Sequence, residues 1–194
     1  MRPPSLCLRR HCYPVSAGFP PQRSILLPIE PMSPTITLRP LTESDMPFLL
    51  ALYATTREDE LRQVDWTPEQ KGAFVHQQFW AQHQFWQENY RYTSWDVVLR
   101  DGEPIGRLYV ARWPEDIRIV DIALVPEHRG GGIGSELIRA LFAEGDASGR
   151  KVSIHVEMFN PARRLYERMG FVQAGDRGVY LLMERPPAPA EAPV

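Results

Sequence analysis

The 194-residue sequence predicts a mixed α/β fold of the α+β type, in which helices pack on a central sheet. Two kinds of apolar spacing carry this prediction: alternation in short runs, which indicates about seven strands, and helical spacing in longer runs, which indicates about four helices. Along the chain these elements are one strand, two helices, three strands, a helix, a strand, a helix and two strands. Because strands and helices do not alternate regularly, this order does not describe a doubly wound parallel sheet.

Residues 32–185 hold all of these elements and are predicted to form one domain. Residues 1–31 are rich in proline and arginine and carry no acidic residue before Glu30, so we expect a disordered extension or a misassigned start. Met32 leads directly into the first strand and is the favoured start. Residues 186–194 are mostly proline and alanine and are expected to form a disordered tail.

The first half of the domain is expected to contain a strand at 35–39, which Pro40 ends, and two helices. The second helix spans about 68–87 and begins with Thr67 as its cap. It carries aromatic side chains among glutamines, namely Phe74, Phe79, Trp80, Phe85 and Trp86 with Gln77, Gln78, Gln82, Gln84 and Gln87.

In the second half, strands at 95–99 and 105–110 flank the hairpin turn Asp101–Gly102. Further strands are expected at 119–125, 152–158, 171–174 and 179–183, and helices are expected to begin at Ile133 and at Asn160–Pro161.

Composition excludes several classes of function. A net charge of −2 and a pI near 6.2 argue against non-specific nucleic-acid binding. No apolar run approaches the ~18 residues that a membrane-spanning helix needs, so no membrane partner is expected. Cys7 and Cys12 are the two cysteines, so the rest of the chain offers no disulfide, thiolate metal site or cysteine nucleophile. We therefore expect a cytoplasmic protein without a metal, and a homodimer is left open as its assembly.

One stretch of the chain combines a strand that ends at Val125, a turn at Gly130–Gly132 and a helix that begins at Ile133. The first N–H groups of a helix have no partner within it and lie at the positive end of the helix dipole. Glycines before them let an anion approach the main chain without interference from Cβ atoms. This order predicts a pyrophosphate site built from main-chain N–H groups.

The glycine spacing separates the families that use such a site. A dinucleotide fingerprint needs a glycine at its sixth position, where this chain has Ser135 counted from Gly130 and Leu137 counted from Gly132. A nucleotide-binding P-loop needs a lysine after its second glycine, and the loop has none. The alternative without a ligand is a glycine-rich connector.

The pattern Arg129-x-x-Gly132-x-Gly134, directly after a strand that ends Leu-Val-Pro-Glu, resembles the acyl-CoA signature of the GNAT superfamily of N-acetyltransferases. A second stretch, Asn160 to Phe171, resembles the closing motif of that superfamily. The resemblance covers about residues 35–184. It implies a mostly antiparallel sheet that splays between its fourth and fifth strands, and acetyl-CoA as co-substrate.

The resemblance also implies cofactor-binding residues. Main-chain groups of Leu124 and Val125 are expected to contact the pantetheine arm as an added strand would, and Asn160 is expected to meet the same arm. The Arg129 side chain is a further candidate for contact with phosphate. The pyrophosphate is expected to lie on the main-chain N–H groups of Arg129, Gly130, Gly131, Gly132, Ile133 and Gly134.

The catalytic candidates come from the last motif and two strands. Tyr166 matches the family's tyrosine near the thioester sulfur, and a phenol with a pKa near 10 can protonate a departing thiolate. The gap from Asn160 to Tyr166 is one residue shorter than in the commoner form of this motif. His155, Glu157 and Asp121 lie on polar strand faces and are candidates for the general base. The alternatives are a packing tyrosine and solvated strand residues.

The resemblance implies an enzyme that transfers an acetyl group from acetyl-CoA to a primary amine of a small molecule or peptide. We expect the transfer to be direct, since no core cysteine can carry the acetyl group. The helix at 68–87, with Trp66 before it, is a candidate for the acceptor pocket, and core packing is the alternative. Two other functions stay open: a regulatory module that binds acyl-CoA without turnover, and an N-acetyltransferase of proteins or peptides.

Overall fold

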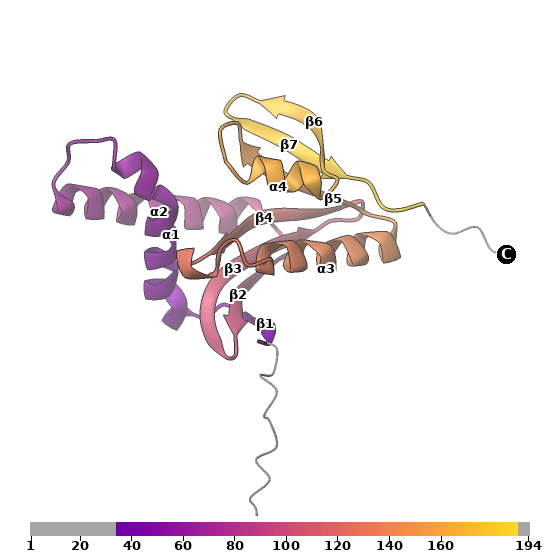
Figure 1. The fold of residues 1–194 in the computed structure, drawn as a ribbon, viewed down its shortest axis with the longest axis horizontal. Helices are drawn as coiled ribbons and strands as arrows, with labels where there is room; N and C mark the ends of the chain where they lie inside the picture. The colour runs from indigo at the N-terminus through magenta and orange to yellow at the C-terminus, as the bar shows by residue number, and fades with distance from the viewer. Residues whose placement is uncertain (1–33, 190–194) are drawn as a thin grey trace, which may run out of the picture. The chain divides into compact units, whose positions relative to one another are not determined.

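A computed structural model of the chain describes residues 34–189. These residues form a seven-stranded sheet with strand order β1-β2-β3-β4-β5-β7-β6, and four α-helices pack on it (Figure 1). Neighbouring strands are antiparallel except for the parallel pair β4–β5. The prediction of a mixed, mostly antiparallel sheet with about four helices is confirmed. The expectations for residues 1–31, and for the tail from residue 190 onward, lie outside the described residues.

The strands are β1 (Ile36–Pro40), β2 (Thr93–Arg100), β3 (Glu103–Arg112), β4 (Asp116–Leu124), β5 (Lys151–Glu157), β6 (Val172–Arg177) and β7 (Tyr180–Arg185). The helices are α1 (Met46–Leu61), α2 (Pro68–Asn89), α3 (Ile133–Ser148) and α4 (Arg163–Arg168). The last of these is shorter than predicted. The Asn160 side-chain carbonyl accepts the Ala162 N–H at 2.9 Å, so residues 160–162 form a turn ahead of the helix.

Two hydrophobic clusters stabilise the fold, one for each pair of helices. Apolar residues of α3 and α4 pack with strand residues, and α1 and α2 form a second cluster with the end of β4. The first cluster includes Ile119, Leu137, Ile138, Phe142, Ile154 and Tyr166, and the second includes Leu49, Leu52, Tyr53, Val75 and Phe79. Because successive strand residues face opposite sides, one sheet serves both clusters.

The sheet opens between β4 and β5, as the resemblance implied. Their pairing runs only as far as Ile119 with Ile154, although β4 continues to Leu124 and β5 to Glu157. Just beyond the last pair, Val120 has no partner in the register with β3, which is a β-bulge. A bulge strengthens the local twist and changes which residues face each side. The end of β4 therefore turns away from β5.

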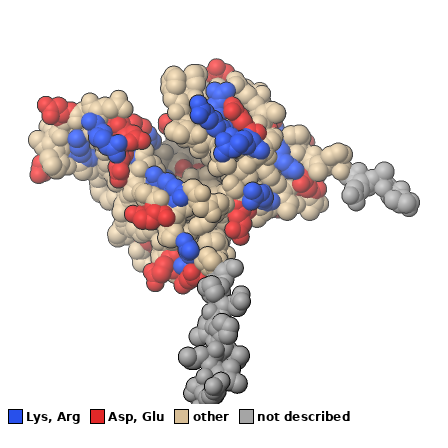
Figure 2. Space-filling model, viewed as in Figure 1, with Lys and Arg blue, Asp and Glu red and all other residues tan. Residues whose placement is uncertain are grey.

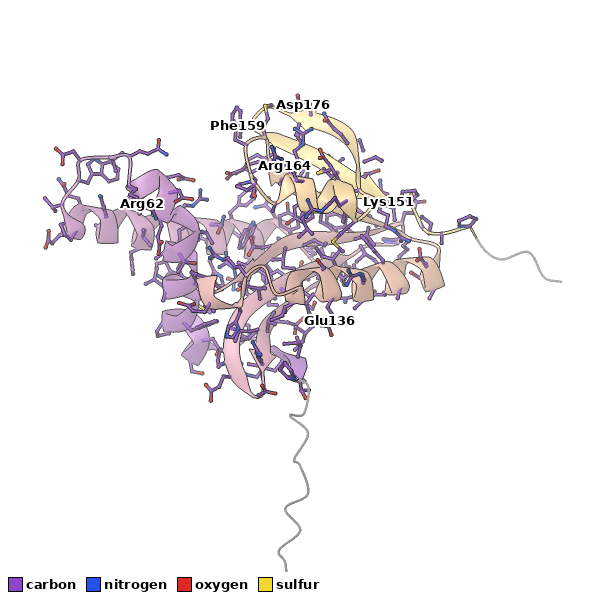
Figure 3. All side chains as sticks on the ribbon, viewed as in Figure 1. Arg62, Glu136, Lys151, Phe159, Arg164 and Asp176 are labelled. Atoms are coloured by element: carbon purple, nitrogen blue, oxygen red, sulfur yellow. The ribbon has the colours of Figure 1, made fainter. Side chains whose placement is uncertain are left out.

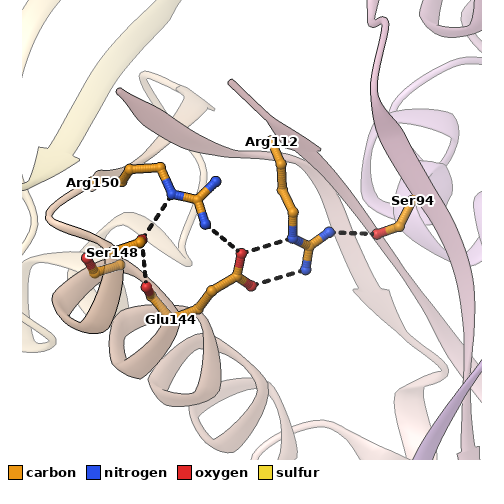
Figure 4. Close-up of polar contacts among 6 residues, drawn as sticks. Ser94, Arg112, Glu144, Ser148 and Arg150 are labelled. Carbon is orange, nitrogen blue, oxygen red and sulfur yellow. Dashed lines mark hydrogen bonds and ion pairs between the residues drawn. The ribbon is translucent and has the colours of Figure 1, made fainter. Parts of the chain in front are cut away.

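The C-terminal part of α3 is fixed to the opposite ends of the strands (Figure 4). The Arg112 guanidinium donates to both carboxylate oxygens of Glu144, at 2.8 and 3.0 Å, and to the Ser94 hydroxyl at 3.0 Å. Arg150 donates to the same carboxylate at 2.9 Å. These bidentate, charge-assisted bonds hold the pKa of Glu144 below its usual value, with the Arg112 bond the largest cause. The helix is thus anchored at the end away from the glycine loop.

Candidate active site at the opening of the sheet

A cavity of about 550 Å³ lies where β4 and β5 separate. Its walls come from α1 and α2 on one side and from β5, α4 and β7 on the other. The face seen in Figure 2 is hollowed between these two regions. The lining residues used below are Arg57, Glu60, Gln82, Phe85, Trp86, Arg107, Asp121, His155, Glu157, Asn160, Tyr166 and Tyr180.

The cavity brings together the four predicted catalytic residues. Tyr166 belongs to α4, which packs on the face of the sheet that α3 covers. Asp121, His155 and Glu157 point to the face that α1 and α2 cover, because they alternate with apolar residues of the first cluster. Only the opening between β4 and β5 lets these side chains from two faces line one space. Asn160 lines the same cavity.

Tyr166 is buried, with 6% of its surface exposed. Burial, and secondarily the negative charge of Asp121, raise the pKa of its phenol to about 12. The hydroxyl therefore keeps its proton at neutral pH. A neutral phenol in a cavity wall can act as a proton donor.

Asp121 is engaged in a buried ion pair. The Arg107 Nε donates to Asp121 Oδ2 at 2.6 Å, and Arg107 is only 2% exposed. The guanidinium also lies 5.2 Å from the ring centroid of Trp86 and 5.4 Å from that of Tyr109. An aspartate held by a charge-assisted hydrogen bond is poorly placed to accept a proton from a substrate.

His155 is bonded to an arginine on the neighbouring strand. The distance from Arg118 Nη1 to His155 Nδ1 is 3.1 Å. A guanidinium has donors and no acceptor, so the imidazole nitrogen accepts.

Glu157 has the longest ionic contact of the three candidate bases. Its carboxylate lies 3.8 Å from Arg57 Nη1, and 44% of its side chain is exposed. The same Arg57 nitrogen makes a shorter contact of 2.8 Å with Glu60. Burial first, and then the charge of Glu157, raise the pKa of the neighbouring Tyr180 phenol. The Tyr180 phenol also hydrogen-bonds to Glu157. Among the described residues, the nearest charged partner of Glu157 is nevertheless farther away than those of Asp121 and His155.

The glycine loop lies beyond the end of β4, which lines the cavity with residues Val120–Ala123. Gly130 and Gly132 have φ values of +75° and +90°, in the left-handed region that favours glycine. A Cβ built on Gly130, Gly131, Gly132 or Gly134 meets nothing within 4 Å. The first hydrogen bond of α3 runs from the Glu136 N–H to the Gly132 carbonyl, at 3.0 Å. The preceding N–H groups therefore stand at an open surface.

The main chain at the end of β4 favours one of the two residues predicted to contact pantetheine. The Val125 N–H donates to Ile105 of β3 at 2.9 Å, and its carbonyl accepts the His128 N–H at 3.0 Å. Because main-chain groups alternate along a strand, those of Leu124 point away from β3, toward the opening. The Leu124 carbonyl accepts Arg129 Nε at 2.7 Å.

The Arg129 side chain bonds to residues that precede it in the sequence. Besides Leu124, it donates to the Thr55 hydroxyl of α1 at 2.6 Å. The predicted contact of its side chain with phosphate stays a prediction, and the structure gives Arg129 a second role in tying α1 to the end of β4.

Sequence reasoning did not identify Arg107, Arg118 or Arg57. A signal existed for Arg107, because it is a single charged residue within an apolar strand run and the strand that follows carries Asp121.

The helix with glutamines and aromatics contributes Gln82, Phe85 and Trp86 to the cavity. Its other residues include Phe79, which belongs to the second hydrophobic cluster. Trp66 packs on Phe74, with ring centroids 5.3 Å apart.

No helix within residues 34–189 has the length and apolar character needed to cross a membrane. Within the same residues, no group of three or more histidine, cysteine, aspartate or glutamate side chains is arranged to hold a metal ion.

The chain is similar to known proteins in sequence and in fold. Mycothiol acetyltransferase of Corynebacterium glutamicum (strain R) is 37% identical over 121 residues, which are 60% of this chain and 40% of that protein. The chain thus spans less than half the length of this relative.

Two solved structures share the fold. PaiA N-acetyltransferase from Thermoplasma acidophilum, in complex with coenzyme A, has a TM-score of 0.59 and 16% identity, over 78% of this chain and 99% of that one. The ribosomal-protein-S18-alanine N-acetyltransferase from Escherichia coli has a TM-score of 0.54 and 17% identity, over 82% of this chain and 99% of that one. At such identities the likeness concerns the fold alone.

The sequence model of the acetyltransferase (GNAT) family matches residues 57–171, which are more than half of the chain. The match includes the opening of the sheet, the glycine loop and Tyr166. The chain belongs to the acetyltransferase (GNAT) family.

Proposed function

We propose that the protein is an N-acetyltransferase that transfers an acetyl group from acetyl-CoA directly to a primary amine. The observation that carries this proposal is the cavity at the opening of the sheet. There a buried neutral phenol, Tyr166, shares one space with the carboxylate of Glu157. Acyl transfer to an amine is assisted by a group that accepts the proton of the amine and by one that donates a proton to the departing thiolate.

The residues present fit acetyl-CoA. The open glycine surface before α3 supplies main-chain N–H groups for the pyrophosphate, from Gly130 to Gly134. The role first assigned to the Arg129 N–H stays a prediction, since that group already donates to the Pro126 carbonyl at 3.1 Å. The main-chain N–H of Leu124, at the edge facing the opening, and the Asn160 side chain would hold the pantetheine arm, while the Leu124 carbonyl accepts from Arg129. The role first assigned to Val125 stays a prediction, since its main-chain groups already have partners. When bound, acetyl-CoA supplies the activated thioester.

The side chains then divide the proton transfers. Glu157 accepts the proton that the attacking amine loses, directly or through one water. Tyr166 donates its phenolic proton to the departing sulfur. Asp121 stays paired with Arg107, and its charge helps to keep the phenol protonated. A new amide bond replaces the thioester bond, and one proton has moved from the amine to Glu157 and one from Tyr166 to the thiol. Glu157 then returns its proton, through water, to the Tyr166 phenolate, so the net transfer is one proton from the amine to the thiol.

Exposed apolar side chains favour a peptide amine as a second candidate acceptor beside small-molecule amines. We call them the rim of the cavity: Phe85, which lines it, with Phe159 and Val179, which adjoin the lining residues Asn160 and Tyr180. Phe85 lines the cavity and is 55% exposed. Phe159, at the outer end of the connection between β5 and α4, is 93% exposed (Figure 3). Val179 is 68% exposed, and its carbonyl accepts the Met158 N–H at 3.0 Å, which brings the two connections together. Apolar side chains after a peptide's first residue could contact this rim.

Two measurements test the proposed function. Calorimetry should detect CoA binding, and release of free thiol should follow when acetyl-CoA is supplied with an acceptor from a panel of small amines and peptides. At about 100 times its Kd, CoA should stabilise the fold by about 2.7 kcal/mol. Binding without thiol release across the panel would favour a regulatory acyl-CoA module. A failure to bind CoA would overturn both functions.

Three broader expectations belong to this proposal. Residues 32–185 are taken as the catalytic domain. A cytoplasmic location and a homodimeric assembly remain predictions from the sequence.

A further inference from the structure

A buried polar cluster lies beside the proposed catalytic groups, at the point where β4 and β5 stop pairing. Its centre is Arg118 of β4, which is 9% exposed, and its other members are Asp116 and Ser153, 8% and 0% exposed. The mechanism proposed above does not use these residues. Burying a charged guanidinium is costly unless its donors are all satisfied, so the cluster calls for an explanation.

Every part of the Arg118 guanidinium has a partner. Nε donates to the Ser153 hydroxyl at 2.5 Å, and Nη2 donates to Asp116 Oδ2 at 3.0 Å. Ser153 in turn donates to the other carboxylate oxygen of Asp116, at 2.5 Å. The guanidinium also lies 5.4 Å from the ring centroid of Trp113. These contacts come from both strands, and they fix the direction of the remaining nitrogen, Nη1.

That remaining nitrogen is directed at His155. Nη1 lies 3.1 Å from His155 Nδ1. Since arginine cannot accept a hydrogen bond, Nδ1 must be the acceptor and carries no proton. In a neutral imidazole the proton is then on Nε2. The bond to Arg118 therefore selects one tautomer of His155.

We propose that Arg118 is a positioning residue that holds His155 as the Nε2–H tautomer, so that His155 serves the cavity as a hydrogen-bond donor and not as the general base. His155 directly follows Ile154, the last residue of β5 that pairs with β4, and it lines the cavity. The assignment of the tautomer stands without the proposed function. Its consequence for catalysis rests on that function, because an N–H donor stabilises negative charge that develops on an acyl oxygen.

Nitrogen-15 NMR of the full, unmodified chain tests the tautomer without any turnover. The His155 signals are assigned by their absence from His155→Gln. We expect Nδ1 at the chemical shift of an unprotonated imidazole nitrogen and Nε2 at that of a protonated one. Protonated Nδ1 with unprotonated Nε2 would overturn the proposal. This result is independent of whether any amine is acetylated.

A pair of variants tests the role of Arg118. Replacing Arg118 alone would leave the buried Asp116 carboxylate without its cationic partner. The test variant is therefore Arg118→Gln combined with Asp116→Asn, and Asp116→Asn alone is its control. The double variant should give imidazole shifts averaged between the two tautomers, whereas the control should keep the Nε2–H pattern. If the double variant folds and keeps the wild-type shifts, Arg118 does not position His155.

The catalytic consequence has its own readout. Glutamine can place an N–H donor near the position of Nε2, so His155→Gln should keep kcat/KM for acetyl transfer within about tenfold of wild type. His155→Phe removes the donor and should lower kcat by roughly 10²-fold, as loss of one oxyanion donor does, with CoA affinity unchanged. If both variants instead lost activity equally and by a large factor, and both lost the acidic limb of the pH–rate profile, His155 would be the general base. That result would overturn its proposed role as a hydrogen-bond donor.

Discussion

At the scale of single residues, the polar side chains of the cavity differ in what they already contact. Asp121 lies 2.6 Å from Arg107 and His155 lies 3.1 Å from Arg118, while the Arg57 guanidinium lies 3.8 Å from the Glu157 carboxylate, which the Tyr180 phenol also contacts. A group that must accept a proton should not first have to give up a strong partner. Geometry therefore ranks three candidates that the sequence left unranked.

Glu157→Gln should lower kcat/KM by roughly 10²-fold, because the amide cannot accept the proton of the attacking amine. Glu60→Gln is the matched control, since Glu60 lines the same cavity and also contacts Arg57. An exposed ion pair contributes below about 1 kcal/mol, so this control should stay within about fivefold of wild type. Similar losses in both variants would argue for a merely electrostatic role.

Tyr166→Phe should lower kcat by roughly 10²-fold while CoA affinity is kept, because only the proton donor is lost. The raised pKa of about 12 means that ionisation of Tyr166 should not reduce the rate between pH 7 and 10. Tyr90→Phe is the control, since Tyr90 lines the cavity and stacks on Trp113. A Tyr166→Phe enzyme with normal kcat would leave Tyr166 as a packing residue.

At the scale of elements, the sequence predicted what depends on local pattern. The strands and helices were recognised from their apolar spacing, and the glycine loop from its position between a strand and a helix. The start of α4 was misplaced, because Asn160 caps a turn and not the helix itself. The bulge at Val120 carries no local signal. It depends on the register with β3, which is a tertiary property.

Contacts between distant elements could not be predicted from the sequence, because they too are tertiary properties. Arg129 bonds to Thr55, 74 residues away, and Arg118 bonds to His155, 37 residues away. No periodicity relates such positions. The composition of the cavity could therefore be predicted in part, while the partner of each polar group could not.

The glycine surface before α3 gives a prediction for this element. Gly132→Ala should weaken CoA binding by roughly tenfold or more, about 1.4 kcal/mol, because its Cβ intrudes where the pyrophosphate meets the main chain. Gly149→Ala is a matched control at the other end of α3, since Gly149 also has a positive φ, +66°, and open space around its Cβ site. Both should lose about 1–2 kcal/mol of stability from the left-handed backbone. Calorimetry that shows equal CoA affinity in the two variants would place the pyrophosphate elsewhere.

At the scale of the whole molecule, both hydrophobic clusters, the cavity and the glycine loop lie within residues 34–189. A chain shortened to residues 32–189 should therefore keep the Tm and the CoA affinity of the full chain. Thermal unfolding with and without CoA measures both. A shortened chain that fails to fold, or that loses CoA affinity, would show that the removed residues contribute to the domain.

Two buried tyrosines should limit the stability of the molecule in alkali. Tyr109 is fully buried between Trp86 and Trp95, and burial raises its pKa to about 12, as it does for Tyr166. In the unfolded chain both phenols ionise near pH 10. Because the folded pKa is the higher one, their contribution is complete below pH 10 and is lost as the pH rises from 10 through 12.

The size of this loss follows from the shift. One pKa unit is worth about 1.36 kcal/mol, so at pH 11 each tyrosine should have lost about 1.4 kcal/mol relative to pH 8. Phenylalanine cannot ionise in either state. Urea unfolding at the two pH values should therefore show a smaller alkaline loss in the Tyr109→Phe, Tyr166→Phe double variant than in wild type, by roughly 3 kcal/mol. Equal losses would mean that the two phenols ionise as readily in the folded protein as in the unfolded chain, and Tyr166 would then have no reason to remain a proton donor above pH 10.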